Sequence, residues 1–285
     1  SKLASLASRY PAIKLTTDFT ELLSDPNIDA IAVATPVHTH YELGLAALRA
    51  GKHLWMEKPM TQTVAQAKRL VDEAARRRLT LLVDHTFIYT GAVAKMDELI
   101  KSGDLGCILY YDAVRVNLGL FQRDVGVISD LAVHDFSLLD FLLDEKPVAV
   151  TASGTNHFPG TPENLAYVTL YYDSGTMAHV NVSWLAPVKV RRIMVGGSKK
   201  MIAYDDLEPS EKVKVYDKGV VFTDDPTQIR EMRIGYRTGD MCAPKLAVAD
   251  ALSTEGEHFV DCIQHGLTPI TDGQLGLRVV RLIEA

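Results

Sequence analysis

The feature that most constrains this chain is a set of nearly continuous apolar runs, at residues 29–34, 53–56 and 79–83. A strand with one buried face alternates apolar and polar residues, whereas a strand buried on both faces is apolar throughout. The stretches between the runs have helical periodicity, and Thr63 is suited to capping one of these helices. The pattern therefore predicts strands alternating with helices on a parallel sheet.

The character of the sequence changes after residue 103. A strand-like segment runs to Asn117, an apolar helix is predicted near residues 131–143, and short strands separated by turns follow. One alternating segment ends at Tyr172, and after the turn at 173–175 a second continues to Trp184, which predicts an antiparallel hairpin. We therefore expect two domains, residues 1–103 and residues 104–285, the second closed by helices at 255–265 and 274–285.

Composition and charge exclude several classes of protein. The formal charge of −6 is spread along the chain, and the basic run at 76–78 lies where a helix is expected to end, so nucleic acid is not an expected partner. No apolar run has membrane-spanning length and no signal peptide is visible, so no membrane association is expected. Cys107, Cys242 and Cys262 are odd in number and widely spaced, which favours reduced thiols and a cytoplasmic location.

Polar residues follow each apolar run. They are Thr35 to His40, Glu57 to Pro59, and Asp84 to Thr86. Ligands of open parallel sheets bind outside the carboxyl ends of the strands. Helix caps and loops would explain any one of these groups, but three together indicate a binding site.

Lys58 is the most informative residue of these groups, because Pro59 keeps it extended and blocks the start of a helix. A solvated surface lysine is the alternative. We favour an ammonium held at the strand end and directed into the site.

A second polar pair is formed by Asp130 and His134, four residues apart at the amino end of the predicted apolar helix. At this spacing the carboxylate can orient or charge the imidazole. A capped helix with a satisfied core histidine explains the spacing equally well, and the residues alone do not decide between the two interpretations.

No metal is expected, although several side chains offer suitable ligand atoms. These are His38, His40, His85, His134 and Asp130. Their spacing does not match a zinc site, and the cysteines lie far from them in sequence.

The motifs Glu57-Lys58-Pro59 and Asp130-x-x-x-His134 resemble, in order and separation, those of the glucose-fructose oxidoreductase, inositol dehydrogenase and MocA-type family. The resemblance covers essentially the whole chain. It implies a Rossmann-type, doubly wound parallel α/β sheet followed by an α+β domain with an open, mainly antiparallel sheet. It also implies a dehydrogenase that oxidises a sugar with NAD or NADP, with NAD the expected cofactor.

The resemblance implies roles for individual residues. Lys58 lies beside the nicotinamide and the reacting hydroxyl, His134 is the general base, and Asp130 orients His134 or the sugar. This fits the chemistry, since oxidising an alcohol needs a base for the hydroxyl proton and a cation for the developing alkoxide. The expected cofactor-binding residues are Thr35, Pro36, His38, His40, Glu57, Lys58 and His85, although many members carry asparagine at the place of His85.

Residues 115–122 and 188–206 look like a branch of the family that acts on nucleotide-linked sugars. The substrate is then expected to be a nucleotide-linked N-acetylhexosamine or its uronate. Arg115, Asn117 and Gln122 are candidate substrate contacts beside Lys58, Asp130 and His134, although an edge strand and loop would look the same. By the same resemblance we expect a homo-dimer or homo-tetramer.

Two alternatives remain open within the same fold. One is a glycoside hydrolase that retains its NAD, and the other is a sugar-binding or assembly subunit without turnover. In the family, the first strand, the Gly-x-Gly-x-x-Gly turn and the acidic residue that reads the ribose would all precede Ser1, so the parallel sheet is expected to be incomplete at its amino-terminal side. A chain without them is not expected to bind the dinucleotide tightly.

Overall fold

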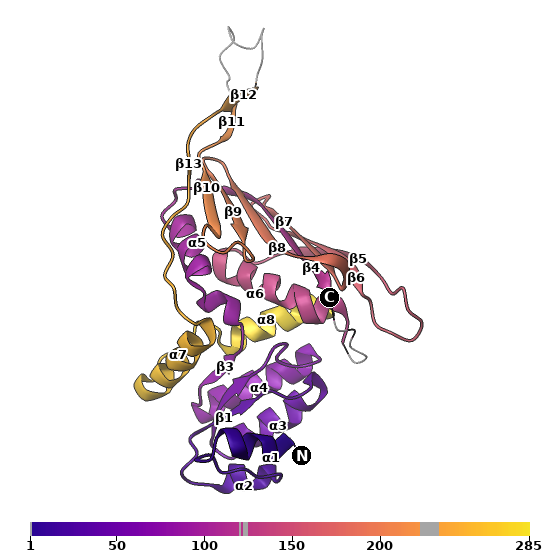
Figure 1. Cartoon of the computed structure of the whole chain (residues 1–285), viewed down its shortest axis with the longest axis vertical. Coiled ribbons are helices and arrows are strands. Elements are labelled where there is room, and N and C mark those ends of the chain that lie inside the picture. The colour runs from indigo at the N-terminus through magenta and orange to yellow at the C-terminus, as the bar shows by residue number, and fades with distance from the viewer. Residues whose placement is uncertain (1, 120, 122–124, 223–233) are drawn as a thin grey trace.

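The computed structural model describes residues 2–119, 121, 125–222 and 234–285. Figure 1 shows a small unit that carries the amino terminus and a larger unit built on a broad sheet. No helix among the described residues is long and apolar enough to cross a membrane.

The small unit is a parallel sheet flanked by helices, as the apolar runs predict. Its strands lie in the order β1-β2-β3. Their bounds are Ala30–Val33 (β1), His53–Met56 (β2) and Leu81–Val83 (β3). The helices are α1 (Lys2–Arg9), α2 (Phe19–Ser24), α3 (Val37–Arg49) and α4 (Val64–Arg77). Every residue of β3 is buried, which accounts for its unbroken apolar sequence.

The ends of α4 follow from local chemistry. The hydroxyl of Thr63 accepts a hydrogen bond from the backbone N–H of Gln66, which confirms the predicted cap. The helix ends at Arg78, whose φ of 58° is left-handed, and the preceding arginines lie in its last turn beside the negative end of the helix dipole.

The larger unit is an eight-stranded, mainly antiparallel sheet in the order β13-β10-β9-β8-β4-β7-β6-β5. Its strands are β4 (Ile108–Leu118), β5 (Ala149–Thr155), β6 (Leu165–Tyr171), β7 (Met177–Ser183), β8 (Leu185–Gly197), β9 (Met201–Asp205), β10 (Val213–Tyr216) and β13 (Met241–Cys242). β4 and β7 pair in parallel, and the other neighbours are antiparallel. The predicted hairpin is confirmed as β6 and β7, and a separate pair, β11 (Gly219–Phe222) and β12 (Ile234–Arg237), extends beyond this sheet (Figure 1).

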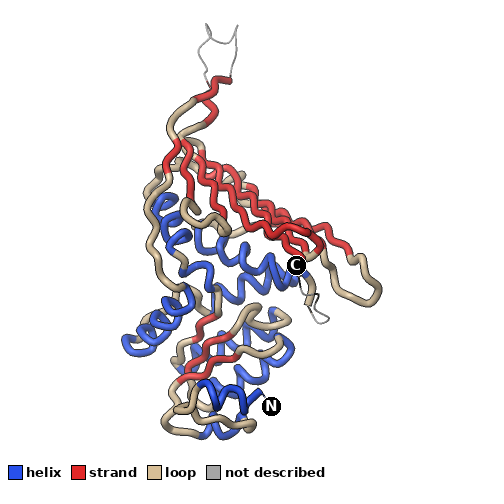
Figure 2. The backbone as a smooth tube through the Cα atoms, in the orientation of Figure 1, coloured by secondary structure: helices blue, strands red, loops and turns tan. Residues whose placement is uncertain are grey.

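Helices cover one face of the large sheet, and the other face carries none (Figure 2). The covering helices are α5 (Gly91–Lys101), α6 (Val133–Leu142) and α8 (Gly273–Glu284), while α7 (Ala251–His265) lies beside the small unit. Short turns precede α5 and α6: the 3₁₀ turn η1 (Thr86–Tyr89) and the π-helical turn η2 (Ile128–Ala132). Along β6, Val168 is 2% exposed and Tyr167 is 43% exposed, the alternation of a sheet with one buried face.

Two apolar cores result, one on the large sheet and one around the small sheet, and α8 serves both. Leu275 and Val279 pack into the first core, whereas Leu277 and Val280 pack into the second. Its contacts with α4 and β3 on one side and with α6 on the other place α8 between the two units.

Candidate active site

A hollow of about 410 Å³ lies at the carboxyl ends of β1 and β2, where ligands of parallel sheets bind. Its walls come from both units. They are Ala34, Thr35, Pro36, Val37, Glu57, Lys58, Pro59, Val125, Ser129 and Asp130.

Lys58 connects the two units across this hollow. Its ammonium donates to the carbonyl oxygen of Asp130 at 2.9 Å and to the Oδ1 atom of the same residue at 3.1 Å. The other carboxylate oxygen of Asp130 accepts from Nε1 of Trp184 at 3.1 Å. The ammonium is therefore held in one direction rather than solvated freely.

The turn that carries Asp130 is π-helical rather than α-helical. The spacing of four residues led us to expect Asp130 and His134 one α-helical turn apart and in contact, and the structure differs from this expectation. The carboxylate of Asp130 is engaged by Lys58 and Trp184 instead. Glu163 supports this turn, since its Oε1 atom accepts from the backbone N–H of Ile128.

His134 follows the turn at the start of α6 and is largely buried. Its ring meets the Phe87 ring edge to face at 4.9 Å, and its buried Nδ1 atom has no hydrogen-bond partner among the described residues. Burial, and then the nearby positive charges of Lys58 and Arg115, hold the pKa of His134 well below its ordinary value. The imidazole is therefore neutral at physiological pH, the state in which it accepts a proton.

His85 lies in the same cluster, directly after β3. Its side chain is buried, and neither ring nitrogen has a hydrogen-bond partner in the part of the chain that the structure describes. Burial, and then the charge of Lys58, lower its pKa to about 3. The charge of Lys58 acts on His134 as well as on His85, so the three side chains are neighbours.

The remaining residues predicted to bind cofactor occupy different places. Thr35 and Pro36 line the hollow, and the Thr35 hydroxyl lies 2.6 Å from that of Thr39. His38 is exposed on the first turn of α3. His40 is buried behind that turn, with its ring nitrogens 3.0 Å from the carbonyl oxygen of Pro59 and 2.7 Å from that of Thr35, so it ties together the segments that follow β1 and β2.

The side chain of Arg115 points into the interior of the larger unit. This residue belongs to the buried face of β4, where its guanidinium forms an ion pair with Asp135 at 2.8 Å and lies over the Phe87 ring. The sequence alternation of β4 predicts this inward direction, because Tyr111 and Ala113 share the buried face. Asn117 is half-buried near the end of β4, and Gln122 lies outside the described residues.

Some residues of the site were not predicted from the sequence. Trp184 contacts Asp130, Phe87 contacts His134, and the Arg191 guanidinium lies 5.4 Å from the centre of the Phe87 ring. Arg191 also forms an ion pair with Asp206 at 3.2 Å. Arg191 and Asp206 lie in the segment 188–206 that resembles the nucleotide-sugar branch, but neither was singled out, and the strand register that places Arg191 opposite Arg115 is a long-range property.

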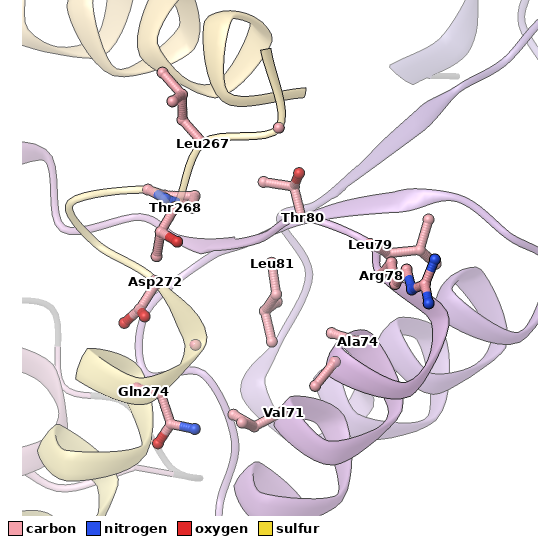
Figure 3. A pocket seen from close by; sticks show the side chains of 14 residues that line it. Val71, Ala74, Arg78, Leu79, Thr80, Leu81, Leu267, Thr268, Asp272 and Gln274 are labelled. Carbon is pink, nitrogen blue, oxygen red and sulfur yellow. The ribbon is translucent and has the colours of Figure 1, made fainter. Parts of the chain in front are cut away.

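Figure 3 shows a second hollow, of about 380 Å³, between α4, the end of α7 and the start of α8. It lies beside Thr80, at the amino end of β3 and therefore at the opposite end of the sheet from Lys58. Its Asp272 carboxylate caps α8 by accepting from the Leu275 N–H. No group of three or more histidine, cysteine or acidic side chains in the described parts of the chain is placed to hold a metal ion.

Comparison with known proteins identifies relatives of both units. Residues 2–85 match a family model described as "Oxidoreductase family, NAD-binding Rossmann fold". Residues 93–203 match one described as "GFO/IDH/MocA C-terminal domain".

Individual relatives agree with these matches. The chain is 27% identical over 256 residues to a UDP-N-acetylglucosamine 3-dehydrogenase of Acidithiobacillus ferrooxidans. The matched region covers 89% of this chain and 76% of that protein. The chain is 26% identical over 229 residues to a myo-inositol 2-dehydrogenase of Thermotoga maritima, covering 76% and 69% respectively. A solved structure of the Acidithiobacillus enzyme superposes with a TM-score of 0.81 at 25% identity, covering all of this chain and 85% of that one.

Proposed function

Because this chain belongs to the GFO/IDH/MocA family of oxidoreductases, we propose that it oxidises a ring hydroxyl of a sugar with a nicotinamide cofactor. The observation that supports this most strongly is the fixed ammonium of Lys58, held by Asp130 from the other unit at the carboxyl ends of the parallel strands.

Lys58 acts on the oxygen of the substrate. An ammonium has three N–H donors, and the contacts of Lys58 with Asp130 use two of them, which leaves the third for the substrate hydroxyl. Its positive charge stabilises the oxygen as negative charge develops during oxidation. Since Asp130 fixes the amine, little reorientation is needed when the substrate arrives.

His134 takes the hydroxyl proton on its imidazole. The ring is neutral because burial and the surrounding cations disfavour its charged form. As the proton moves to His134, the oxygen keeps the electron pair that becomes the second bond of the carbonyl group.

The hollow fits the nicotinamide end of a dinucleotide. Thr35 and Pro36 form one wall after β1, and Glu57 and Lys58 form another after β2. When bound, the cofactor accepts the hydride from the carbon that carries the hydroxyl. NAD is proposed in preference to NADP, with Thr35, Pro36, His38 and Glu57 on its side of the site.

The proposed substrate is a nucleotide-linked N-acetylhexosamine or its uronate. The likeness to UDP-N-acetylglucosamine 3-dehydrogenase over most of the chain supports this choice. Arg191, partly exposed beside the Phe87 ring, offers a cation for an anionic substrate. We also propose that residues 1–103 bind the dinucleotide, and that residues 104–285 bind the substrate and form a homo-dimer or homo-tetramer through the helix-free face of the large sheet.

The proposal is tested by NADH absorbance with the purified protein. UDP-N-acetylglucosamine, its uronate, free sugars and inositol are supplied with NAD or NADP. We expect reduction of the cofactor with a nucleotide-linked sugar, and its loss in Lys58→Ala but not in Lys101→Ala, a surface control. A folded protein that reduces neither cofactor with any of these substrates contradicts the proposal, as does release of an aglycone from a chromogenic glycoside without net reduction.

A further inference from the structure

Glu255 is a fully buried carboxyl group that the mechanism above does not use. It projects from α7 towards the end of β3, 170 residues earlier in the chain. Its Oε1 atom accepts from the backbone N–H of His85 at 3.2 Å. Its Oε2 atom is buried and receives no hydrogen-bond donor from the described residues.

The carboxyl group of Asp84 is a close neighbour of the Glu255 carboxyl group. Two ionised carboxylates repel each other in a buried site, which favours a proton on one of them. Asp84 already accepts from the N–H and hydroxyl groups of Thr86. The Oε2 atom of Glu255 receives no donor from the described residues, so we place the proton there. Burial, and then the charge of Asp84, raise the pKa of Glu255 to about 9.

This carboxyl pair connects α7 to the candidate active site. One partner accepts from the backbone of His85, and the other lies one residue before it. The His85 ring is a neighbour of Lys58 and His134, so any shift of its backbone moves a ring inside the site. α7 itself is anchored by Phe259, whose ring meets Trp55 of β2 at 5.6 Å.

We propose that Glu255 is a positioning residue of this active site, and that its neutral carboxyl group holds the Asp84–His85 segment so that the His85 ring packs correctly against the Lys58–His134 pair. The proposal rests on the function proposed above for Lys58 and His134. It adds a residue from a distant helix, with a defined protonation state, to the groups on which turnover depends.

The charged and titratable groups around Glu255 define what its ionisation would do. Asp84 and His85 face it from the end of β3, and Tyr89 faces it from η1. Beyond Asp84 lies Glu57, whose pKa is raised by burial and then by Asp84. Loss of the proton would place two negative charges in one buried contact, which would push α7 and the His85 segment apart.

The test compares Glu255→Gln, Glu255→Ala and a control, Glu257→Gln, which is exposed on the same helix. Glutamine keeps a neutral donor and acceptor but has no proton to lose. We expect kcat of Glu255→Gln within about twofold of wild type at neutral pH, and kcat of Glu255→Ala lower by roughly 10- to 100-fold, as for a misplaced active-site group. Wild type and Glu257→Gln should lose kcat/KM near pH 9, and Glu255→Gln should not.

A second readout needs no substrate. In protein labelled with ¹⁵N-histidine, the His85 and His134 resonances should shift with a midpoint near pH 9 in wild type and stay unshifted in Glu255→Gln. If the resonances titrate this way but the protein has no sugar dehydrogenase activity, the positioning role of Glu255 stands and the proposed function is wrong. An alkaline titration that is absent from wild type, or unchanged in Glu255→Gln, overturns the positioning role whether or not Glu255→Ala folds.

Discussion

The ammonium of Lys58 contacts Asp130 twice, through the main-chain carbonyl oxygen and through the carboxylate. The two residues are 72 positions apart and belong to different units of the molecule. A main-chain acceptor persists whatever side chain stands at 130, so substitutions there remove only part of what holds the lysine.

Substitution of Asp130 is therefore expected to lower activity in graded steps. Asp130→Asn keeps one acceptor oxygen, which can serve Lys58 or Trp184 but not both, and it loses the charge, so we expect kcat to fall about tenfold; in Asp130→Ala, kcat should fall about 100-fold. Steady-state kinetics check this order. Trp184→Phe serves as a control for the indole contact, and equal losses in the two Asp130 variants would show that the charge alone matters.

The pH dependence of kcat/KM is expected to report His134. Its pKa lies well below the ordinary value of 6.5, so activity should persist through pH 6.5 and fall only at clearly lower pH, where the imidazole becomes protonated. Arg191→Gln removes a nearby cation and should move this acid limb to higher pH. His134→Asn should lower kcat by roughly 10²- to 10⁴-fold. An acid limb at or above pH 6.5 in wild type would show that the base is not this buried ring.

The buried ion pair of Arg115 and Asp135 is expected to govern folding stability rather than substrate affinity. Both side chains are buried, so Asp135→Ala leaves an uncompensated charge and should lower the free energy of unfolding by about 3–5 kcal/mol. The exposed pair of Arg192 and Asp205 is a matched control, and Arg192→Ala should change stability by less than about 1 kcal/mol. Urea unfolding measures both. Similar costs in the two variants would contradict the assignment of Arg115 to the core.

The stability of the protein is expected to fall between about pH 5 and pH 9 because of Glu255. In the folded chain this group keeps its proton up to about pH 9, whereas its ordinary pKa is 4.5. Between these pH values the folded state binds one more proton than the unfolded state. The contribution of Glu255 to the free energy of unfolding is therefore complete below pH 4.5 and is lost as the pH rises to 9. Tm measured across this range should therefore drop less in Glu255→Gln than in wild type. Parallel curves for the two proteins would mean that Glu255 is ionised.

Local patterns in the sequence predicted much of the fold. Strand β2 occupies the predicted residues, Thr63 caps α4 as expected, and the hairpin of β6 and β7 follows from alternation and a turn. Each of these depends on neighbours close in sequence, which a single chain displays directly. The parallel pairing of β4 with β7 depends on residues far apart and left no such pattern.

The candidate site was likewise predicted only in part from the sequence. The polar strand ends drew attention to Lys58, and the structure places it in a hollow at those ends. The partners of Asp130 were not predicted, because a π-helical turn replaced the assumed α-helical geometry and the indole of Trp184 comes from the bend between β7 and β8, 54 residues later in the chain. Glu255 also escaped notice, since a glutamate on an amphipathic helix usually faces solvent and only tertiary contacts reveal its burial.

Helix α8, which inserts Leu275 and Val279 into one core and Leu277 and Val280 into the other, governs the timing of folding. Ribosomes release the chain from its amino terminus, so both sheets are synthesised before this helix emerges. Neither core is complete until then. The nascent protein therefore keeps part of two apolar surfaces open until α8 has been synthesised, which gives chaperones an opportunity to bind it.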